Sequence, residues 1–392
     1  MIKEQKPKIL TLVGFYLPGY KAGGPLRTIA NMVEHLNDYE FWIITRDRDL
    51  GDESPYEEIK PDKWQRVGNA MVHYLSPERC TIRRLAVLIA ETSYDVLYIN
   101  SFFDPFFTVR PLLARKLGLL PNKPVIIAPR GEFSEGAIKI KRHKKHLFIK
   151  LAGLIRLYAN VVWHASSTHE AQDVLRVLGM GSGTIHVALD LPSRKSLIAS
   201  GVSPQAESAD AVTRVVFLSR ISPKKNLDYA LKALSKVKQK ILFNIYGPAE
   251  DQSYWNRCQE TISQLPANIS VKYWGAVHPD QVSSIFNAHD LFFFPTRGEN
   301  YGHVIAEALS VGTAVLLSDQ TPWRDLQSEH LGWDLPLENI DEFARIIEEY
   351  AIMPIEEKLA WRKDIISKTT KRLSKNETIE ANRSLFMSVV NK

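Results

Sequence analysis

Cysteine and long apolar runs are scarce in this sequence, and each scarcity excludes a class of protein. Only 2 of the 392 residues are cysteine, and they match neither a disulfide framework nor a metal knuckle, which fits a reducing cytosol. No apolar run approaches the roughly 18 residues that span a bilayer. A buried first strand explains the charged start and the short apolar stretch Ile9–Phe15 better than a signal peptide does. We therefore expect a cytoplasmic protein.

The composition indicates a soluble globular chain with an uneven charge. Hydrophobic residues make up 45% and charged residues 24%, which excludes a disordered or fibrous protein. The formal net charge is +6, but residues 109–176 hold 13 Lys and Arg against 4 Asp and Glu. This basic surplus suggests anionic partners without naming one.

Short β-rich runs alternate with helical stretches along the whole chain. Their nearly continuous apolar content is typical of parallel strands covered by helices on both faces. The sequence predicts the following strands: 9–15, 41–45, 71–74, 96–99 and 125–128, and then 215–219, 241–246, 270–274, 291–294 and 314–318. The predicted fold is therefore α/β, with two Rossmann-like doubly wound domains facing across a cleft.

A stretch rich in Ser, Pro and Gly divides the two series of strands. We expect an N-terminal domain over 1–191, a linker over 192–213, a C-terminal domain over 214–360 and a helical tail over 361–392. The halves share no close sequence repeat, so they are expected to be alike in architecture only.

The sharpest local feature is a polar loop between a strand and a helix that starts near Gly302. The loop carries Glu299, and Glu307 follows just inside the helix. The amino end of a helix exposes unpaired N–H groups and can hold an anion, while carboxylates can accept hydrogen bonds from sugar hydroxyls. Taken singly, Glu299 could merely cap the helix and Glu307 could pair with His303.

Two further segments follow predicted strands. Arg220 and Lys225 stand directly after 215–219, where a diphosphate would lie in a doubly wound domain. Gly23 and Gly24 end a glycine-containing loop after the first strand and offer bare N–H groups to an anion. That loop lacks the Gly-x-Gly-x-x-Gly fingerprint of dinucleotide-binding domains.

As a set, these segments resemble the retaining nucleotide-sugar glycosyltransferases of family 4, in the glycosyl transferases group 1, which have the GT-B arrangement of two facing domains. Glu299 and Glu307 match the family's Glu-x7-Glu signature, and Arg220 with Lys225 matches its Arg and Lys pair. Further agreement lies in the glycine loop and in three short motifs. These are 129–132, 246–248 and 321–323, the last with Gly332-Trp333.

The resemblance implies a role for each matching residue. Arg220 and Lys225 would neutralise the donor diphosphate, with Gly23 and Gly24 approaching it from the other domain. Glu299 would hold donor-sugar hydroxyls and Glu307 the ribose hydroxyls. The backbone of three residues would contact sugar and phosphate: Asn300, Tyr301 and Gly302. The reaction would retain anomeric configuration and need no metal and no other cofactor.

Departures from the family pattern concern the loop geometry and the first domain. Ser219 and Asn226 stand where many members have glycine, and a histidine often found in the first domain has no match. Arg130 and Glu132 occupy the comparable stretch and are candidates for its role. Asp47-Arg-Asp49 spells a metal signature of another glycosyltransferase architecture, but we interpret it as a chance match.

The resemblance implies that the nucleotide sugar binds in the C-terminal domain, over 214–360. It also implies that the acceptor, a glycan or a lipid-linked sugar, binds mainly in the N-terminal domain, over 1–191. The basic run 139–146, followed by apolar residues up to 155, has the look of a segment that meets an anionic membrane face. A solvated helix face is the equally supported alternative. Two other functions remain open: a nucleotide-binding protein of this fold without transferase activity, and a nicotinamide-dependent oxidoreductase. Aromatic residues that could stack on bases are not interleaved in the basic stretch, so no nucleic-acid partner is expected.

Overall fold

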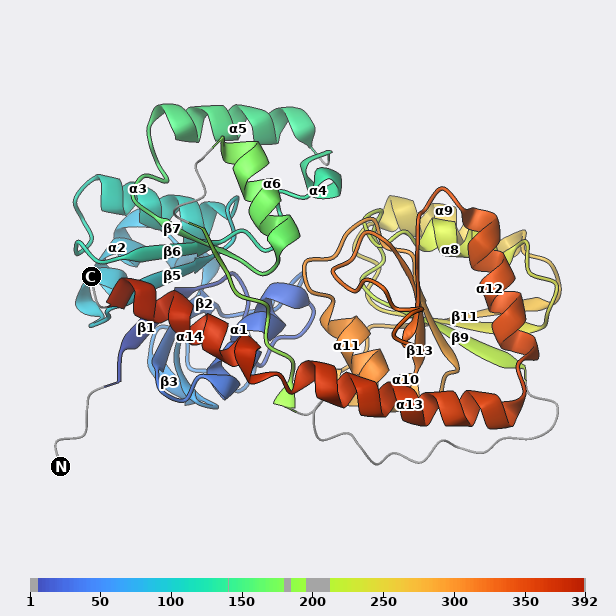
Figure 1. Ribbon diagram of the computed structural model, residues 1–392. Coiled ribbons are helices and arrows are strands. Elements are labelled where there is room, and N and C mark those ends of the chain that lie inside the picture. Colours follow the sequence, from blue (N-terminus) through green and yellow to red (C-terminus); the bar gives the residue numbers. More distant parts are fainter. Residues whose placement is uncertain (1–5, 140, 180–184, 195–211, 391–392) are drawn as a thin grey trace. The chain divides into compact units, whose positions relative to one another are not determined.

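The chain folds into two compact α/β units. The computed structural model describes residues 6–139, 141–179, 185–194 and 212–390 (Figure 1). The N-terminal unit comprises Met1–Leu191 together with Asn376–Lys392, and the C-terminal unit comprises Pro192–Lys375. Most of the expected linker, 195–211, lies outside the described residues.

The N-terminal unit is built on one sheet of eight strands. Their order is β3-β4-β2-β1-β5-β6-β7-β8, and only β3 runs antiparallel to its neighbour. The strands are β1 (Lys8–Leu12), β2 (Glu40–Arg46), β3 (Trp64–Val67), β4 (Ala70–Leu75), β5 (Val96–Asn100), β6 (Val125–Ala128), β7 (Val162–Ala165) and β8 (Ile185–Val187). All five residues of β5 are buried, as expected of a central strand covered on both faces.

Helices cover both faces of this sheet. One apolar cluster includes side chains of α1 and α14, and another includes side chains of α2, α3, α5 and α6. The helices are α1 (Gly24–His35), α2 (Ile82–Glu91), α3 (Arg110–Lys116), α4 (Glu135–Lys139), α5 (Arg142–Leu154), α6 (Thr168–Leu178) and α14 (Asn376–Val390). Short turns of 3₁₀ helix (Pro77–Arg79) and π-helix (Pro105–Val109) join the elements near α2 and α3.

The C-terminal unit has a six-stranded, fully parallel sheet around a single core. The order is β11-β10-β9-β12-β13-β14. Its strands are β9 (Thr213–Leu218), β10 (Ile241–Tyr246), β11 (Ile269–Gly275), β12 (Leu291–Phe294), β13 (Ala314–Ser318) and β14 (Gly332–Leu335). Its helices are α8 (Leu227–Leu234), α9 (Gln252–Ser263), α10 (Pro279–Asn287), α11 (His303–Ser310), α12 (Ile340–Ile352) and α13 (Ile355–Leu373). The two parallel-sheet domains predicted from the alternating pattern are therefore confirmed.

The last two helices, α13 (Ile355–Leu373) and α14 (Asn376–Val390), do not form a separate tail as the sequence predicts, because each belongs to one of the two units. The expected boundary at residue 360 falls inside α13, which belongs to the C-terminal unit, whereas α14 returns to the N-terminal unit. There Phe386 is fully buried, and its ring meets those of Tyr39, Phe41 and Tyr98 at centroid distances of 5.4, 6.1 and 5.4 Å. The last helix is thus part of the first core.

We predict that Phe386→Ala destabilises the N-terminal unit by about 3–5 kcal/mol, because a large buried ring is removed and leaves a cavity. Met387→Ala is the matched control, since Met387 is the next residue of the same helix and is 44% exposed. Urea unfolding of both variants measures the difference. Equal stability of the two variants would contradict the placement of α14.

Candidate functional site

The predicted second-domain motifs lie where the order of the C-terminal sheet reverses. The chain passes from β9 outward to β10 and β11, then returns to β12 on the other side of β9. The loops that follow β9 and β12 therefore lie on the two sides of the position where the strand order reverses, and ligands of open α/β sheets bind at such a position. Arg220 and Lys225 follow β9, while Glu299 follows β12.

Hydrogen bonds join these two loops directly. The Arg297 N–H donates to the Lys224 carbonyl at 2.8 Å, and the Thr296 hydroxyl donates to the same oxygen at 3.2 Å. The Asn226 amide donates to the Pro295 carbonyl at 2.8 Å and accepts from Arg297 Nε at 2.9 Å. These hydrogen bonds fix the loops after β9 and β12 with respect to each other.

Asn226 is the central residue of this junction. Its side chain is completely buried, and its backbone has a φ of 64°, in the left-handed region. Asparagine tolerates this region better than most residues. The departure from glycine at this position therefore keeps the backbone conformation that glycine favours, and it adds a side chain that ties the two loops.

Lys225 and Glu299 form an ion pair at the junction, and their side chains are only 12% and 13% exposed. The Lys225 ammonium also lies over the Phe294 ring, 5.5 Å from its centroid. Burial alone would raise the pKa of Glu299, but the positive charges of Lys225 and Lys224 outweigh it and hold the pKa below its ordinary value. The carboxylate therefore stays ionised at neutral pH.

Arg220 lies in the same loop but closer to solvent. Its guanidinium pairs with Glu250 at 3.0 Å, and the two side chains are 33% and 40% exposed. The loop can pass this close to the end of β10 because position 247 is glycine with a φ of 132°. A Cβ there would lie 1.9 Å from the Ser219 carbonyl oxygen. Arg220 thus lies on the same loop as Lys225, and its charge also contributes to lowering the pKa of Glu299.

The helix start predicted near Gly302 is confirmed, because α11 begins at His303 with Gly302 as its N-cap. Gly302 has a φ of 79°, and no side chain caps the helix. The preceding loop is held at both ends: the Trp323 indole donates to the Tyr301 carbonyl at 2.7 Å, and the Glu299 N–H donates to the Gln320 carbonyl at 3.1 Å. Asn300 lies between these two fixed points, half-buried.

Glu299 does not cap this helix, since it pairs with Lys225 instead. Glu307 is half-buried in the second turn of α11. Among the predicted donor-site residues of the C-terminal unit, the contacts therefore bring Lys225 and Glu299 together, place Arg220 on the same loop as Lys225, and attach residues 300–302 to Glu299.

In the N-terminal unit, α1 begins at Gly24 and has Gly23, with a φ of 76°, as its N-cap. A Cβ on Gly24 would meet nothing within 4 Å, so the start of the helix is open. The loop before it is held by Asp49, whose carboxylate accepts from the Tyr20 and Lys21 N–H groups at 2.6 and 2.9 Å. Asp49 is thus an anchor of the glycine loop, a role that the sequence analysis missed.

Asp47, the other acid of the Asp-x-Asp match, is buried and pairs with its neighbour Arg48 at 2.8 Å. Within the ranges that the structure describes, no group of three or more His, Cys, Asp or Glu side chains could hold a metal ion. Asp47 and Asp49 thus each contact other residues of the N-terminal unit: Asp47 pairs with Arg48, and Asp49 holds the loop before α1.

Arg130 and Glu132, the candidates for the first-domain role, both lie in buried surroundings. The Arg130 guanidinium pairs with Asp190 at 2.7 Å, and its side chain is 4% exposed. Glu132 accepts hydrogen bonds from the Ser101 hydroxyl and from the Phe102 and Phe103 N–H groups. Burial raises the pKa of Glu132 above its ordinary value. Both side chains are thus engaged inside the N-terminal unit.

We predict that Glu299→Gln lowers the free energy of unfolding at neutral pH, and that the gap to the unchanged protein narrows as the pH falls. A carboxyl group whose pKa is depressed by folding stabilises the fold above its unfolded pKa of about 4.3 and loses that contribution as the pH falls through the folded pKa. Urea unfolding between pH 7 and pH 3.5 measures the gap. Glu250→Gln is the control, since its exposed ion pair should contribute little at any pH. A gap that is constant with pH would refute the pairing.

Parts of this chain are similar to known proteins. Residues 203–371 match the family model described as glycosyl transferases group 1. The chain is similar to an uncharacterised 41.2 kDa protein in the cps region of Klebsiella pneumoniae, with 24% identity over 66% of this chain and 70% of that one. It is also similar to D-inositol 3-phosphate glycosyltransferase of Segniliparus rotundus, with 30% identity over 26% of this chain and 24% of the relative.

Among solved structures, HepE of Anabaena in complex with UDP and glucose has a TM-score of 0.72. The match covers 98% of this chain and 100% of that one at 15% identity, so it concerns the fold. Sucrose-phosphate synthase of Thermosynechococcus elongatus gives a TM-score of 0.66 at 15% identity, over 97% of this chain and 100% of that one. The chain therefore has the GT-B fold, and residues 203–371 of it are similar to the glycosyl transferases group 1.

Proposed function

We propose that this protein transfers a sugar from a nucleoside-diphosphate sugar to a glycan or lipid-linked acceptor, in polysaccharide or glycoconjugate biosynthesis. The observation that carries the proposal is the largely buried Lys225–Glu299 pair, with Arg220 on the same loop as Lys225, at the point where the order of the C-terminal sheet reverses. The family supports sugar transfer. The cps-region relative supports the biosynthetic setting, and the complex of HepE with UDP and glucose supports a nucleotide-sugar donor.

In this proposal the cations act on the diphosphate. Negative charge grows on the diphosphate as the glycosidic bond breaks, and fixed positive groups stabilise that charge. Arg220 can engage two phosphate oxygens at once, whereas Lys225 acts as a point charge. Gly23 and Gly24, at the open start of α1, would add backbone N–H groups to the same diphosphate.

The acids and the α11 loop hold the sugars. Glu299, kept ionised by Lys225, would accept hydrogen bonds from donor-sugar hydroxyls, and Glu307 would accept them from the ribose. The backbone of Asn300, Tyr301 and Gly302 would contact the sugar and phosphate. We propose that the acceptor attacks from the face that the diphosphate leaves, so that configuration is retained without an enzymatic nucleophile or a metal.

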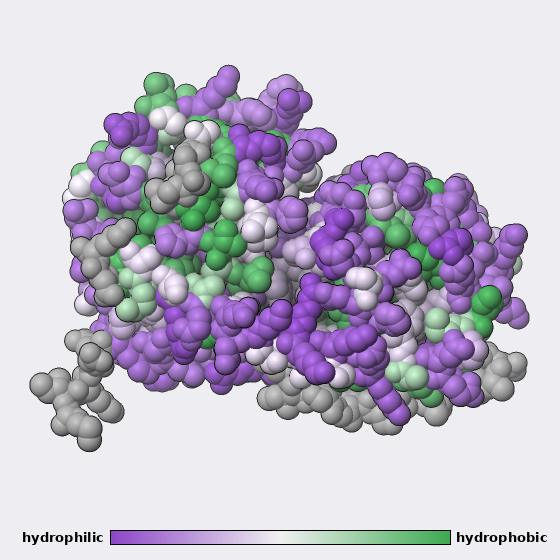
Figure 2. Space-filling model, viewed as in Figure 1, coloured by the Kyte–Doolittle hydropathy of each residue, from purple (hydrophilic) through white to green (hydrophobic). Residues whose placement is uncertain are grey.

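The basic segment 139–155 supports a contact with an anionic membrane face. In α5, Leu147, Leu151 and Leu154 share one face and are 59%, 53% and 80% exposed. Phe148 packs against the core on another face of the helix. Figure 2 shows a hydrophobic patch over the end of α5 that lies farther from α4, and hydrophilic residues over the other end. None of the helices in the described part of the chain is long and apolar enough to cross a membrane.

We predict that one of UDP, GDP and ADP, or a sugar conjugate of one of them, raises the thermal midpoint, because a ligand that binds the folded state stabilises it. Arg220→Ala should reduce that shift and slow release of the diphosphate from the matching sugar nucleotide by about 10²–10³-fold. Lys232→Ala, which removes an exposed cation of α8, is the control. An unshifted midpoint with every nucleotide would refute the proposed function.

We predict that the protein binds vesicles of phosphatidylcholine with phosphatidylglycerol, but not vesicles of phosphatidylcholine alone, in a flotation assay. Replacing Leu151 and Leu154 together by Ser should abolish binding, because both apolar contact and charge are needed for such a surface. The matched control replaces Leu117 and Leu119, two exposed leucines outside α5 in the same unit. Equal binding by both double variants would remove the membrane contact from the proposal.

A second variant tests the contribution of positive charge to the membrane contact in the same flotation assay. Lys139, Lys141 and Lys144 are exposed and can be replaced together, whereas Lys145 is left in place because its ammonium donates to the Ala137 carbonyl at 2.8 Å. This triple variant should bind anionic vesicles more weakly and should lose the salt dependence of binding.

A further inference from the structure

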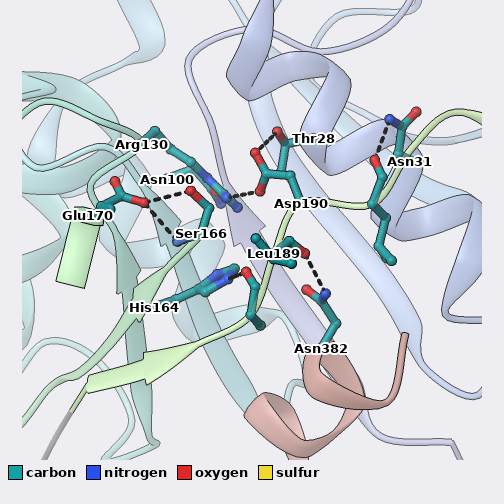
Figure 3. Close-up of polar contacts among 12 residues, drawn as sticks. Thr28, Asn31, Asn100, Arg130, His164, Ser166, Glu170, Leu189, Asp190 and Asn382 are labelled. Carbon is teal, nitrogen blue, oxygen red and sulfur yellow. Dashed lines mark hydrogen bonds and ion pairs between the residues drawn. The ribbon is translucent and has the colours of Figure 1, made fainter. Parts of the chain in front are cut away.

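The last residues of the N-terminal unit before the chain enters the C-terminal unit are each held by a polar side chain (Figure 3). Three of the four contacts are hydrogen bonds to backbone carbonyls, each 2.8 Å long. They join Ala188 to His164 Nε2, Leu189 to Asn382 Nδ2, and Leu191 to Asn31 Nδ2. Burial lowers the pKa of His164 to about 3, so its neutral ring donates through Nε2.

Asp190 makes the fourth contact and lies at the centre of this network. One carboxylate oxygen pairs with Arg130 Nη1 at 2.7 Å, and the other accepts from the Thr28 hydroxyl at 2.8 Å. The Asp190 side chain is only 3% exposed. A single buried carboxylate therefore joins the loop after β6 to helix α1.

Arg130 is itself fixed in place. Its Nε and Nη2 atoms donate to Asn100 Oδ1 at 3.0 and 2.9 Å. The next residue, Gly131, donates its N–H to the buried Glu170 carboxylate at 2.5 Å. The Glu170 carboxylate also accepts from the backbone and hydroxyl of Ser166, both at 2.8 Å. Asp190 thus connects α1 to the loop after β6, which is held by Asn100 at the end of β5 and by Glu170 in α6.

The network acts on the helix whose start the proposed function assigns to the diphosphate. Thr28 and Asn31 lie about one and two turns after Gly24 on α1, about 6 and 10 Å along the helix axis. No side chain caps the helix, so its position depends on contacts along its length. A buried ion pair adds little net stability over apolar residues, so positioning is the better reason for this one.

We propose that Asp190 is a positioning residue for the diphosphate-binding end of α1. Through Thr28 it fixes Gly23 and Gly24 with respect to Arg130 and to the point where the chain leaves the N-terminal unit. This inference rests on the proposed function, in which the start of α1 contacts the diphosphate of the donor.

Thr28→Val tests the proposal, because it removes the hydrogen bond from the Thr28 hydroxyl to Asp190 and keeps both partners of the Arg130–Asp190 pair. Thr92→Val is the matched control: Thr92 is also buried, and its hydroxyl donates to Leu88 at 2.7 Å away from α1. The probe is whichever of UDP, GDP and ADP stabilises the unchanged protein most. We expect Thr28→Val to raise its Kd by about tenfold and to lower kcat/KM for the sugar nucleotide by up to about 100-fold, with an unchanged acceptor KM.

A purely structural role would give a different result. Both threonine variants lose one buried hydroxyl hydrogen bond, so their unfolding midpoints should fall alike. If the Kd of Thr28→Val equals that of Thr92→Val, the positioning role is refuted. Asp190→Asn, which keeps the shape and loses the charge, should weaken nucleotide binding at least as much as Thr28→Val does, and Asp190→Glu should restore part of it.

Hydrogen exchange of the α1 amides separates this inference from the proposed function. We expect faster exchange over residues 24–35 in Thr28→Val and Asp190→Asn than in Thr92→Val. Unchanged exchange would refute the anchor even if nucleotide binding is normal. Binding of none of the three nucleotides by the unchanged protein would refute the proposed function and the purpose assigned to Asp190, whereas the exchange data would still show whether the anchor exists.

Discussion

Two opposite charges, largely buried side by side in the loops that follow β9 and β12, are the constraint on which the candidate site depends. Removing the charge of Lys225 or Glu299 alone from water would cost free energy, and the attraction between the two opposite charges offsets that cost. The pair stays in place because Asn226 and the Lys224 carbonyl tie the two loops together. Charged groups that are fixed before a ligand arrives need little rearrangement when charge develops, which is what sugar transfer from a diphosphate demands.

Much of this site could be predicted from the sequence because its parts are local. A strand, a short polar loop and a helix start are read from neighbouring residues, and Glu299 and Gly302 lie only a few positions apart. Parallel strands then bring loops to one edge by rule, so that Arg220 and Lys225 could be placed as well. The family pattern added the roles, which neither charge nor spacing contains.

The parts that could not be predicted depend on pairings across long stretches of chain. Asp190 meets Thr28 from 162 residues away, and nothing in either neighbourhood marks the pair. The role of Asn226 could not be predicted either, because its left-handed backbone and its amide contacts exist only in the folded state. Arg130 and Glu132 are charged residues of the kinds that bind ligands, so the sequence makes both of them candidates. Only the folded structure shows that Arg130 pairs with Asp190 and that Glu132 accepts a hydrogen bond from Ser101. Helical periodicity in the tail also could not tell which unit α14 joins.

The return of α14 to the first unit has a consequence for biosynthesis. A ribosome makes residues 8–191 long before it makes the helix that carries Phe386, so the nascent N-terminal unit must wait with an open apolar face. The described core of the C-terminal unit is formed by residues between 215 and 373, so this unit can mature during that interval. The core of the first unit is therefore completed only after the whole C-terminal unit has been made.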